Sequence, residues 1–158
     1  MNIKRYMLQM KIKEVLFKEC QNFVNKRLQT VEEIISSNQK ALQSETKSSA
    51  GDKHETGRAM LQLEMEKAGQ QLAGISQMKL ILAKINISKK SETAHLGSIV
   101  ETDFANYFLS ISTGKIMVEE KIYFAISLSS PIGKLLLGKK GNDRFVFNGK
   151  TFKIKKII

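Results

Sequence analysis

Two acidic residues, Asp52 and Glu55, have the spacing that most directly suggests chemistry. They lie three positions apart where a helical pattern begins, so their side chains would project from neighbouring positions on one helix face. Magnesium is commonly held by one or two protein carboxylates together with water and the phosphates of a partner. The pair is therefore a candidate catalytic and metal-holding site.

A structural role explains the same two residues. Aspartate at the N-cap followed three positions later by glutamate is close to a capping box, and both acids suit the positive end of a helix dipole. The two roles are compatible, because Asp52 can cap the helix in the free protein and still reach a metal in a complex. His54, between the acids, faces elsewhere on a helix, and we expect a solvated loop histidine.

The other chemistry-bearing residues are isolated in the sequence. Cys20 is the single cysteine among 158 residues, which excludes a disulfide within the chain and a cysteine-based zinc site. Its apolar neighbours predict a small buried hydrophobe, and His95 is expected to be structural as well. Without a nucleophile–base pair or a glycine-rich phosphate loop, we expect no self-contained active site.

Two long amphipathic patterns flank the acids and must position them. Apolar residues and one asparagine recur in alternating three- and four-residue steps at Val24, Leu28, Val31, Ile35, Asn38 and Leu42, and again at Leu61, Met65, Ala68, Leu72, Ile75 and Leu82. Met78 is expected to take the seam position that Lys79 would otherwise occupy. The patterns mirror each other about a polar break at 47–56, which predicts an antiparallel coiled-coil hairpin over 1–90 with the acids at its tip. Asn38 should cost stability and help to fix the register.

A polar joint at 88–93 separates this region from a second one, 94–158, whose pattern predicts an α+β domain with a mainly antiparallel sheet. Strands are expected at 94–100, 104–111, 117–126, 145–147 and 151–157, the last two joined by a tight turn at Asn148-Gly149. Ser130 and Pro131 predict the start of a short helix that ends at Gly138 and buries Leu135, Leu136 and Leu137. We expect the first helix to pack its base, 7–23, against this domain.

The charge of the chain points to an anionic partner. There are 26 Lys and Arg against 15 Asp and Glu, a net charge of +11, which favours a polyanion or an acidic protein surface. Arg58 near the tip is a candidate for contact with a phosphate of such a partner, and basic residues enrich the second domain, including Lys134, Lys139 and Lys140. No apolar run approaches the roughly 18 residues of a membrane helix. We expect a cytoplasmic protein with no membrane partner.

Two segments resemble the Gre family of transcript-cleavage factors. The run from Ser130 to Lys139 is similar to the family's C-terminal signature, Ser-Pro-Ile/Leu-Ala/Gly followed by Leu-x-Gly-Lys, and Gly51-Asp52-x-x-Glu55 resembles its hairpin-tip motif, Gly-Asp-Leu-Ser-Glu-Asn. The order of the two motifs, hairpin first and Ser-Pro helix later, agrees with the family from about Cys20 onward.

The resemblance implies an FKBP-like second domain, docked at the rim of the RNA polymerase secondary channel with Ser130 and Pro131 at the partner surface. The hairpin would pass down the channel, where Asp52 would help to hold a magnesium ion of the polymerase and Glu55 would support it. The polymerase would then cleave backtracked RNA near its 3′ end. The chain would be a monomeric elongation factor, not itself an enzyme, with no cofactor of its own and magnesium supplied in the polymerase active centre.

Departures from the family's tip keep other functions open. Lys53 and Thr56 replace a leucine and an asparagine, and Gly57-Arg58-Ala59 replaces Ala-Glu-Tyr. A second hypothesis is therefore a non-catalytic regulator that occupies the polymerase channel. A third, from a different class, is a coiled-coil adaptor or chaperone-like binding protein.

Overall fold

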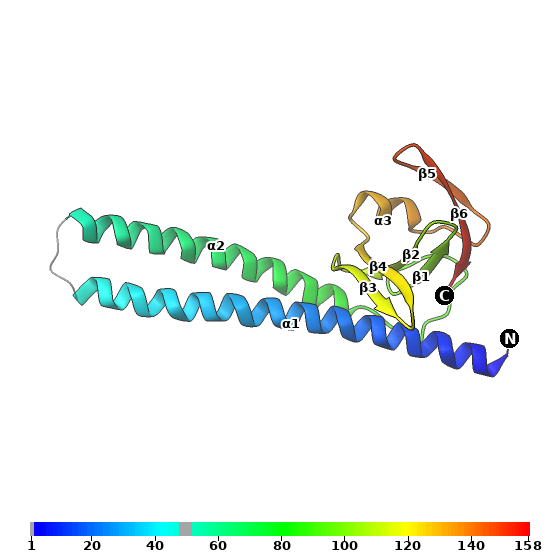
Figure 1. Ribbon diagram of the computed structural model, residues 1–158, viewed down its shortest axis with the longest axis horizontal. Helices are drawn as coiled ribbons and strands as arrows, with labels where there is room; N and C mark the ends of the chain where they lie inside the picture. The colour runs from blue at the N-terminus through cyan, green and yellow to red at the C-terminus, as the bar shows by residue number, and fades with distance from the viewer. Residues whose placement is uncertain (1, 48–51) are drawn as a thin grey trace. The chain divides into compact units, whose positions relative to one another are not determined.

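The computed structural model describes the backbone of residues 2–47 and 52–158 and the side chains of residues 2–44 and 55–158. Two helices, α1 (Ile3–Lys47) and α2 (Asp52–Ala83), precede the sheet (Figure 1). Its strands and one short helix follow in the order β1 (Ile99–Thr102), β2 (Asn106–Ser110), β3 (Gly114–Val118), β4 (Lys121–Ser127), α3 (Pro131–Leu136), β5 (Arg144–Phe147) and β6 (Lys150–Ile157). This arrangement confirms the predicted α+β class.

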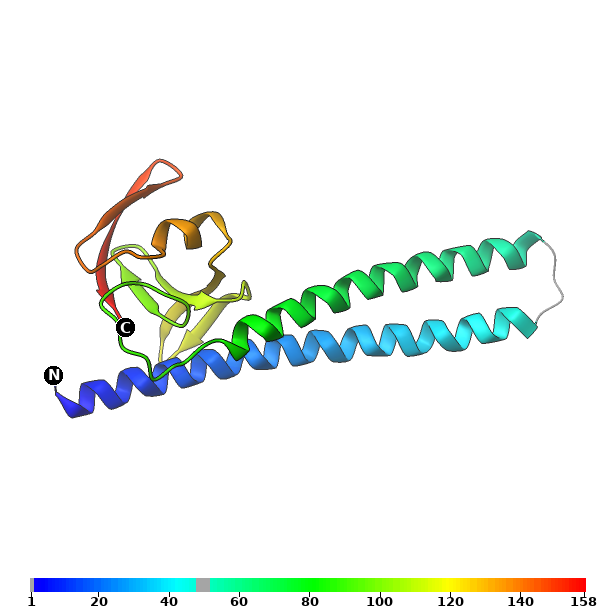
Figure 2. The same ribbon diagram turned by 180° about the vertical axis from the view of Figure 1, so that it is seen from behind.

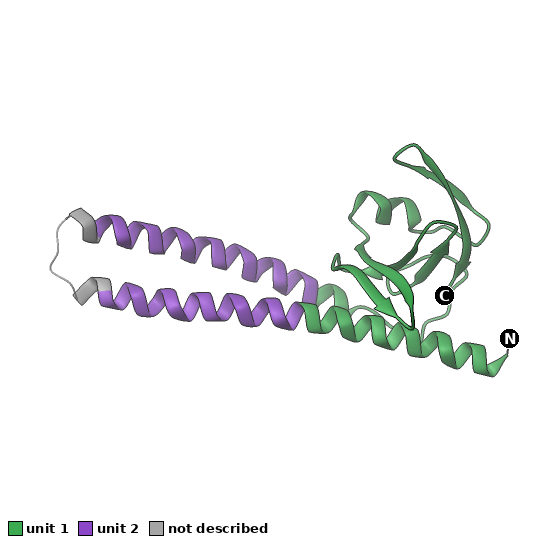
Figure 3. Ribbon diagram, in the orientation of Figure 1, with its two compact units in different colours: residues 1–23, 80–158 green, residues 24–79 purple. Residues whose placement is uncertain are grey.

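The chain divides into two compact units (Figure 3). The hairpin unit comprises residues 24–79, and the base unit comprises residues 1–23 together with 80–158. The predicted domains, 1–90 and 94–158, are each continuous in sequence. The compact units are not, because the first turns of α1, up to residue 23, belong with the sheet. The base of α1 therefore belongs to the same unit as the β-strands.

The hairpin unit is held together by the predicted seam. Figures 1 and 2 both show α1 and α2 side by side and antiparallel. The most deeply buried seam residues are Val24, Val31, Ala68 and Ile75, with exposed fractions between 1% and 5%. Met78 is half-buried and Lys79 is exposed, which confirms that methionine takes the seam position. Burial of these side chains removes apolar surface from water and supplies most of the helical stability.

The base unit is built on a six-stranded sheet in the order β3-β4-β2-β1-β6-β5. Only the β2–β4 pair is parallel, and the other pairs are antiparallel. Strand β2 is buried on both faces, because its alternate side chains pack against different helices. Tyr107 and Leu109 join the core that contains Leu136 of α3. On the other face, Ser110 Oγ lies 3.5 Å from Cys20 Sγ of α1.

This contact confirms two predictions, that Cys20 is buried and that the base of α1 packs on the sheet domain. Leu16 and Cys20 each have 0% exposed surface. Burial raises the pKa of the Cys20 thiol above its ordinary value, with the Ser110 hydrogen bond opposing and Glu19 adding to the shift. The thiol of Cys20 is therefore protonated and buried, in agreement with the small buried hydrophobe that its apolar neighbours predicted.

The strand predicted at 117–126 is wrong as a single element. It is the end of β3 and most of β4, joined by Glu119 and Glu120, whose φ angles are +48° and +66°. Two positive φ angles suit the tight turn between paired strands, but glutamate carries no sequence signal for that conformation. The Asn148-Gly149 turn is confirmed, with φ angles of +50° and +76°. The strand expected at 94–100 begins only at Ile99.

Helix α3 confirms its predicted start and corrects its buried side. Leu136 is fully buried and Leu135 half-buried, but Leu137 is 51% exposed. The helix ends at Leu136, and Leu137 takes non-helical angles of φ −56° and ψ +125°, so its side chain leaves the helical face. Gly138 follows with φ +80°, the left-handed conformation that glycine allows at a helix end.

Candidate functional site

The end of the hairpin unit carries the candidate tip residues. Helix α1 ends at Lys47 and α2 begins at Asp52, so Asp52 occupies the first helical position of the returning arm. The side chains of Asp52 and His54 lie outside the described residues, as does the predicted capping by Asp52. Glu55 is exposed one turn into α2, where a carboxylate is free to meet a partner.

Arg58 is also exposed, three residues after Glu55 on the same helix. Residues three apart on a helix are surface neighbours, so the cation and the acid share one face of α2. This face can offer an oxygen ligand to a metal and a guanidinium to a phosphate at the same time. A partner with both groups, such as a metal-bound nucleic-acid end, would fit it chemically.

The described side chains supply too few ligands for a metal site within this chain. Among residues 2–44 and 55–158, no three His, Cys, Asp or Glu side chains lie together. Magnesium requires octahedral oxygen coordination, and Glu55 with Asp52 would fill only part of it. The acids thus fit a metal shared with a partner, and they would contribute charge and oxygen ligands to it.

The second candidate surface surrounds α3. Ser130 caps the helix: its Oγ accepts a hydrogen bond from Gly133 N at 3.1 Å and donates to Ser127 O at 2.6 Å. Pro131 occupies the first helical position and is exposed. The serine hydroxyl is thus used inside the fold, where it orders α3, while the proline ring is available to a partner.

The predicted basic residues of this surface differ in exposure. Lys134 and Lys140 are exposed, whereas Lys139 is half-buried. The segment that carries them is fixed by main-chain hydrogen bonds, from Ala94 N to Lys139 O at 2.8 Å and from Gly138 N to Ala94 O at 2.8 Å. Lys134 and Lys140 therefore extend from an ordered scaffold, which lowers the entropic cost of binding an acidic surface.

His95 follows Ala94 of this scaffold and contacts neighbouring residues of the same segment. Its Nδ1 lies 2.9 Å from Ser98 Oγ and 3.1 Å from Thr93 O. Ser98 has 0% exposed surface, so its hydroxyl has no access to a substrate. The structural role expected for His95 is thereby confirmed.

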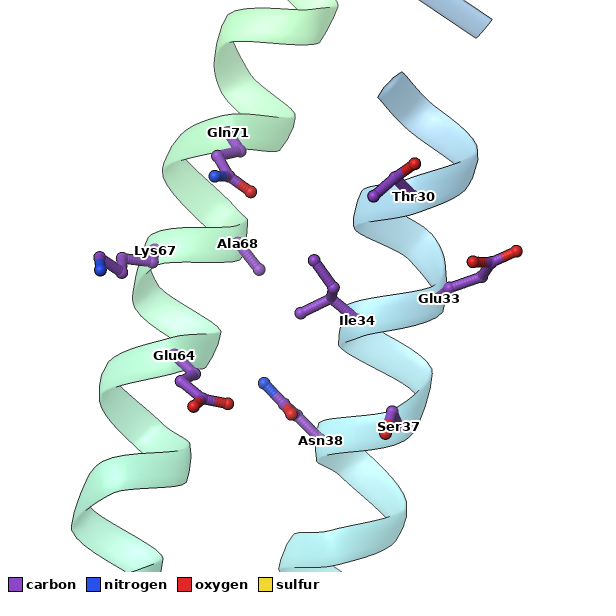
Figure 4. Close-up of a pocket in the computed structure, with 9 residues that line it drawn as sticks. All are labelled: Thr30, Glu33, Ile34, Ser37, Asn38, Glu64, Lys67, Ala68 and Gln71. Carbon is purple, nitrogen blue, oxygen red and sulfur yellow. The ribbon is translucent and has the colours of Figure 1, made fainter. Parts of the chain in front are cut away.

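A groove of about 540 Å³ opens between the two arms of the hairpin unit (Figure 4). Small Ala68 faces the groove from α2, and Asn38 extends into it from α1 toward Glu64. Asn38 is only 7% exposed, and its Nδ2 has no hydrogen-bond partner among the described residues. A buried unpaired amide costs free energy, as predicted for this seam position.

Asn38→Leu is expected to raise the free energy of unfolding of the hairpin by about 1–2 kcal/mol, because it replaces a buried unpaired amide with an apolar side chain. Urea unfolding followed by circular dichroism at 222 nm would measure the change. Gln39→Leu, at an exposed neighbouring position, is the control and should change stability by less than about 0.5 kcal/mol. A loss of stability in Asn38→Leu alone would mean that the amide is satisfied in solution.

Lys13 was not singled out from the sequence. It lies three residues before Leu16 and seven before Cys20, on the helix face that the sheet covers, and it is 2% exposed. A lysine at a buried position of an apolar helical pattern was the signal that could have revealed it, because lysine is almost never fully buried without a role or a partner.

Across the described residues, no helix has the length and apolar character needed to cross a membrane. Comparison with models of protein families finds no matching family, and comparison with curated proteins finds no relative.

Proposed function

We propose that this chain is an accessory factor of RNA polymerase that enters the secondary channel with its hairpin and assists cleavage of backtracked RNA. One observation carries the proposal: in a unit of two long antiparallel helices, the second helix begins at Asp52 and contains Glu55, the two acids of the Gly51-Asp52-x-x-Glu55 motif. At 1.5 Å per residue, α2 alone is about 48 Å long. An arm of that length can bring acids to a catalytic centre deep inside another protein.

The remaining parts of the chain suit the same function. The Ser-capped helix α3, with Lys134 and Lys140 exposed, supports docking on an acidic surface at the channel rim. A net charge of +11 would accelerate association with a polyanionic elongation complex. These features support an arrangement in which the base unit binds the polymerase and the hairpin carries the acids inward.

The chemistry would remain that of the polymerase. Magnesium, when present in that active centre, polarises the phosphodiester and lowers the pKa of the attacking water. Asp52 would add an oxygen ligand and negative charge, and Glu55 would orient water by hydrogen bonding. Arg58 would hold a phosphate of the RNA 3′ segment.

A second candidate function is a regulator that occupies the channel without stimulating cleavage. The exposed Arg58 near Glu55 favours this regulator. Its positive charge, on the same helix face, opposes the binding of a metal cation by the Glu55 carboxylate. Such a factor would bind the polymerase and limit access to its active centre.

The test uses core RNA polymerase from the organism that supplies the chain, assembled in a stalled, backtracked elongation complex. We expect binding of one copy per polymerase and magnesium-dependent shortening of the RNA from its 3′ end. Binding without shortening would support the channel-occupying regulator. Absence of binding would reject both polymerase functions and leave an adaptor role for the hairpin.

A further inference from the structure

A cavity of about 390 Å³ lies within the base unit. It is bounded by the first turns of α1, by the segment 87–92, and by the end of β6. Its described lining is strongly cationic, with one acid, Glu92, and the four lysines Lys13, Lys89, Lys90 and Lys156. Counting side chains only, four positive charges less one negative charge leave a formal excess of three around this space.

Lys13 is the most unusual member of this lining. It is 2% exposed and, among the described residues, its ammonium group forms no hydrogen bond or ion pair. Burial lowers its pKa below the ordinary value for lysine, because the protonated form loses part of its hydration. A buried ammonium without a counter-charge is costly, and an anion in the cavity would remove that cost.

The surrounding charges do not neutralise the cavity. Lys156 is half-buried, and burial is the main cause that lowers its pKa. Arg5 and Lys121 lower this pKa further, and Glu101 raises it. Lys13 and Lys156 therefore stand in a partly desolvated space, where a bound anion would interact more strongly than at an open surface.

The cavity also has apolar walls. Met10, Ile87 and Ile157 line it, together with Tyr6. The Nζ of Lys90 lies 3.9 Å from the centroid of the Tyr6 ring, which holds this lysine at the cavity. The main-chain oxygen of Ile158 accepts a hydrogen bond from Ile99 N at 2.8 Å, so it is already engaged in the fold.

We propose that this cavity binds a small organic phosphate that carries at least two negative charges. Lysine ammonium groups bind phosphate as point charges, and a monoanion such as a simple carboxylate would leave most of the positive excess uncompensated. The apolar walls would contact the organic part of the ligand. The volume lies within the usual range of small-molecule pockets, roughly 300–1,000 Å³. This inference does not depend on the proposed action at RNA polymerase.

The first experiment titrates the full chain with pyrophosphate, ADP, glucose 6-phosphate and adenosine by calorimetry at about 0.15 M salt. We expect saturable binding of pyrophosphate and tighter binding of at least one of the two organic phosphates. Adenosine, which lacks phosphate, should not bind. Absence of saturable binding by all three phosphates overturns the proposal, and equal binding of pyrophosphate and the organic phosphates overturns the role of the apolar walls.

Variants then place the ligand in this cavity. Lys13→Met keeps the length of the side chain without its charge and should weaken phosphate binding at least about tenfold. Lys18→Met, which removes an exposed lysine from the same helix, is the matched control and should change affinity less than about twofold. Lys156→Gln, at a less buried position, should also weaken phosphate binding. This second variant tests the site if Lys13→Met fails to fold. Wild-type affinity in a folded Lys13→Met or in Lys156→Gln would overturn the assignment.

Discussion

Glu55→Gln and Asp52→Asn are each expected to reduce stimulated RNA cleavage in a backtracked elongation complex by about a hundredfold or more, while binding to the polymerase is unchanged. The expected size is that of removing one preorganised electrostatic group from a transition state, roughly 10²–10³ in rate. Each substitution keeps the shape of the side chain and removes its negative charge. The measurement is the rate of RNA shortening at saturating factor and fixed magnesium.

Glu66→Gln is the matched control for this pair. Glu66 is an exposed acid on the same helix, eleven residues beyond Glu55, and its loss changes the net charge by the same amount. It should leave the cleavage rate within about twofold, since exposed charges far from the reaction contribute little. If all three variants lose activity equally, net charge and not the tip position is responsible. If none does, the acids only cap the helix.

Rising magnesium concentration separates the two roles of the acids. If Asp52 supplies an oxygen ligand, higher magnesium should partly restore cleavage in Asp52→Asn, because mass action offsets a weaker site. A residue that only orients water would show no such rescue. This comparison distinguishes the roles proposed for Asp52 and Glu55 within one assay.

Leu16→Ala is expected to lower the free energy of unfolding of the base unit by about 2–5 kcal/mol. Leu16 has 0% exposed surface on α1, one turn from Cys20, whose thiol contacts Ser110 of β2. Its truncation would leave a cavity in the unit that holds the sheet. Urea unfolding followed by tyrosine fluorescence would measure the loss.

Tyrosine fluorescence is selective for the base unit. The chain has three tyrosines and no tryptophan, and Tyr6, Tyr107 and Tyr123 all lie in residues 1–23 or 80–158. Leu8→Ala is the control: Leu8 lies on the same helix but is 46% exposed, so its loss should cost less than about 0.5 kcal/mol. Equal effects of the two variants would show that the base of α1 does not pack on the sheet in solution.

Elements whose signals are local could be predicted from the amino-acid sequence. The alternating three- and four-residue steps of the seam specified both arms of the hairpin, because a helix places those positions on one face. Ser130 and Pro131 marked the start of α3, and Asn148-Gly149 marked the turn before β6, because each residue type favours the required backbone conformation. The tip acids and basic residues could be named in advance for the same reason, since spacing alone places them on an element.

Features that depend on contacts between distant segments are fixed when the chain folds. The turn at Glu119 and Glu120 has two positive φ angles that no local preference predicts, and it forms because β3 and β4 pair on either side of it. The sequence places Lys13 on an apolar helix face, but only the folded chain brings residues 87–92 and the end of β6 to the same cavity. Burial and charge environment are properties of the folded neighbourhood, so a cationic cavity built from three separate segments cannot be read from any one of them.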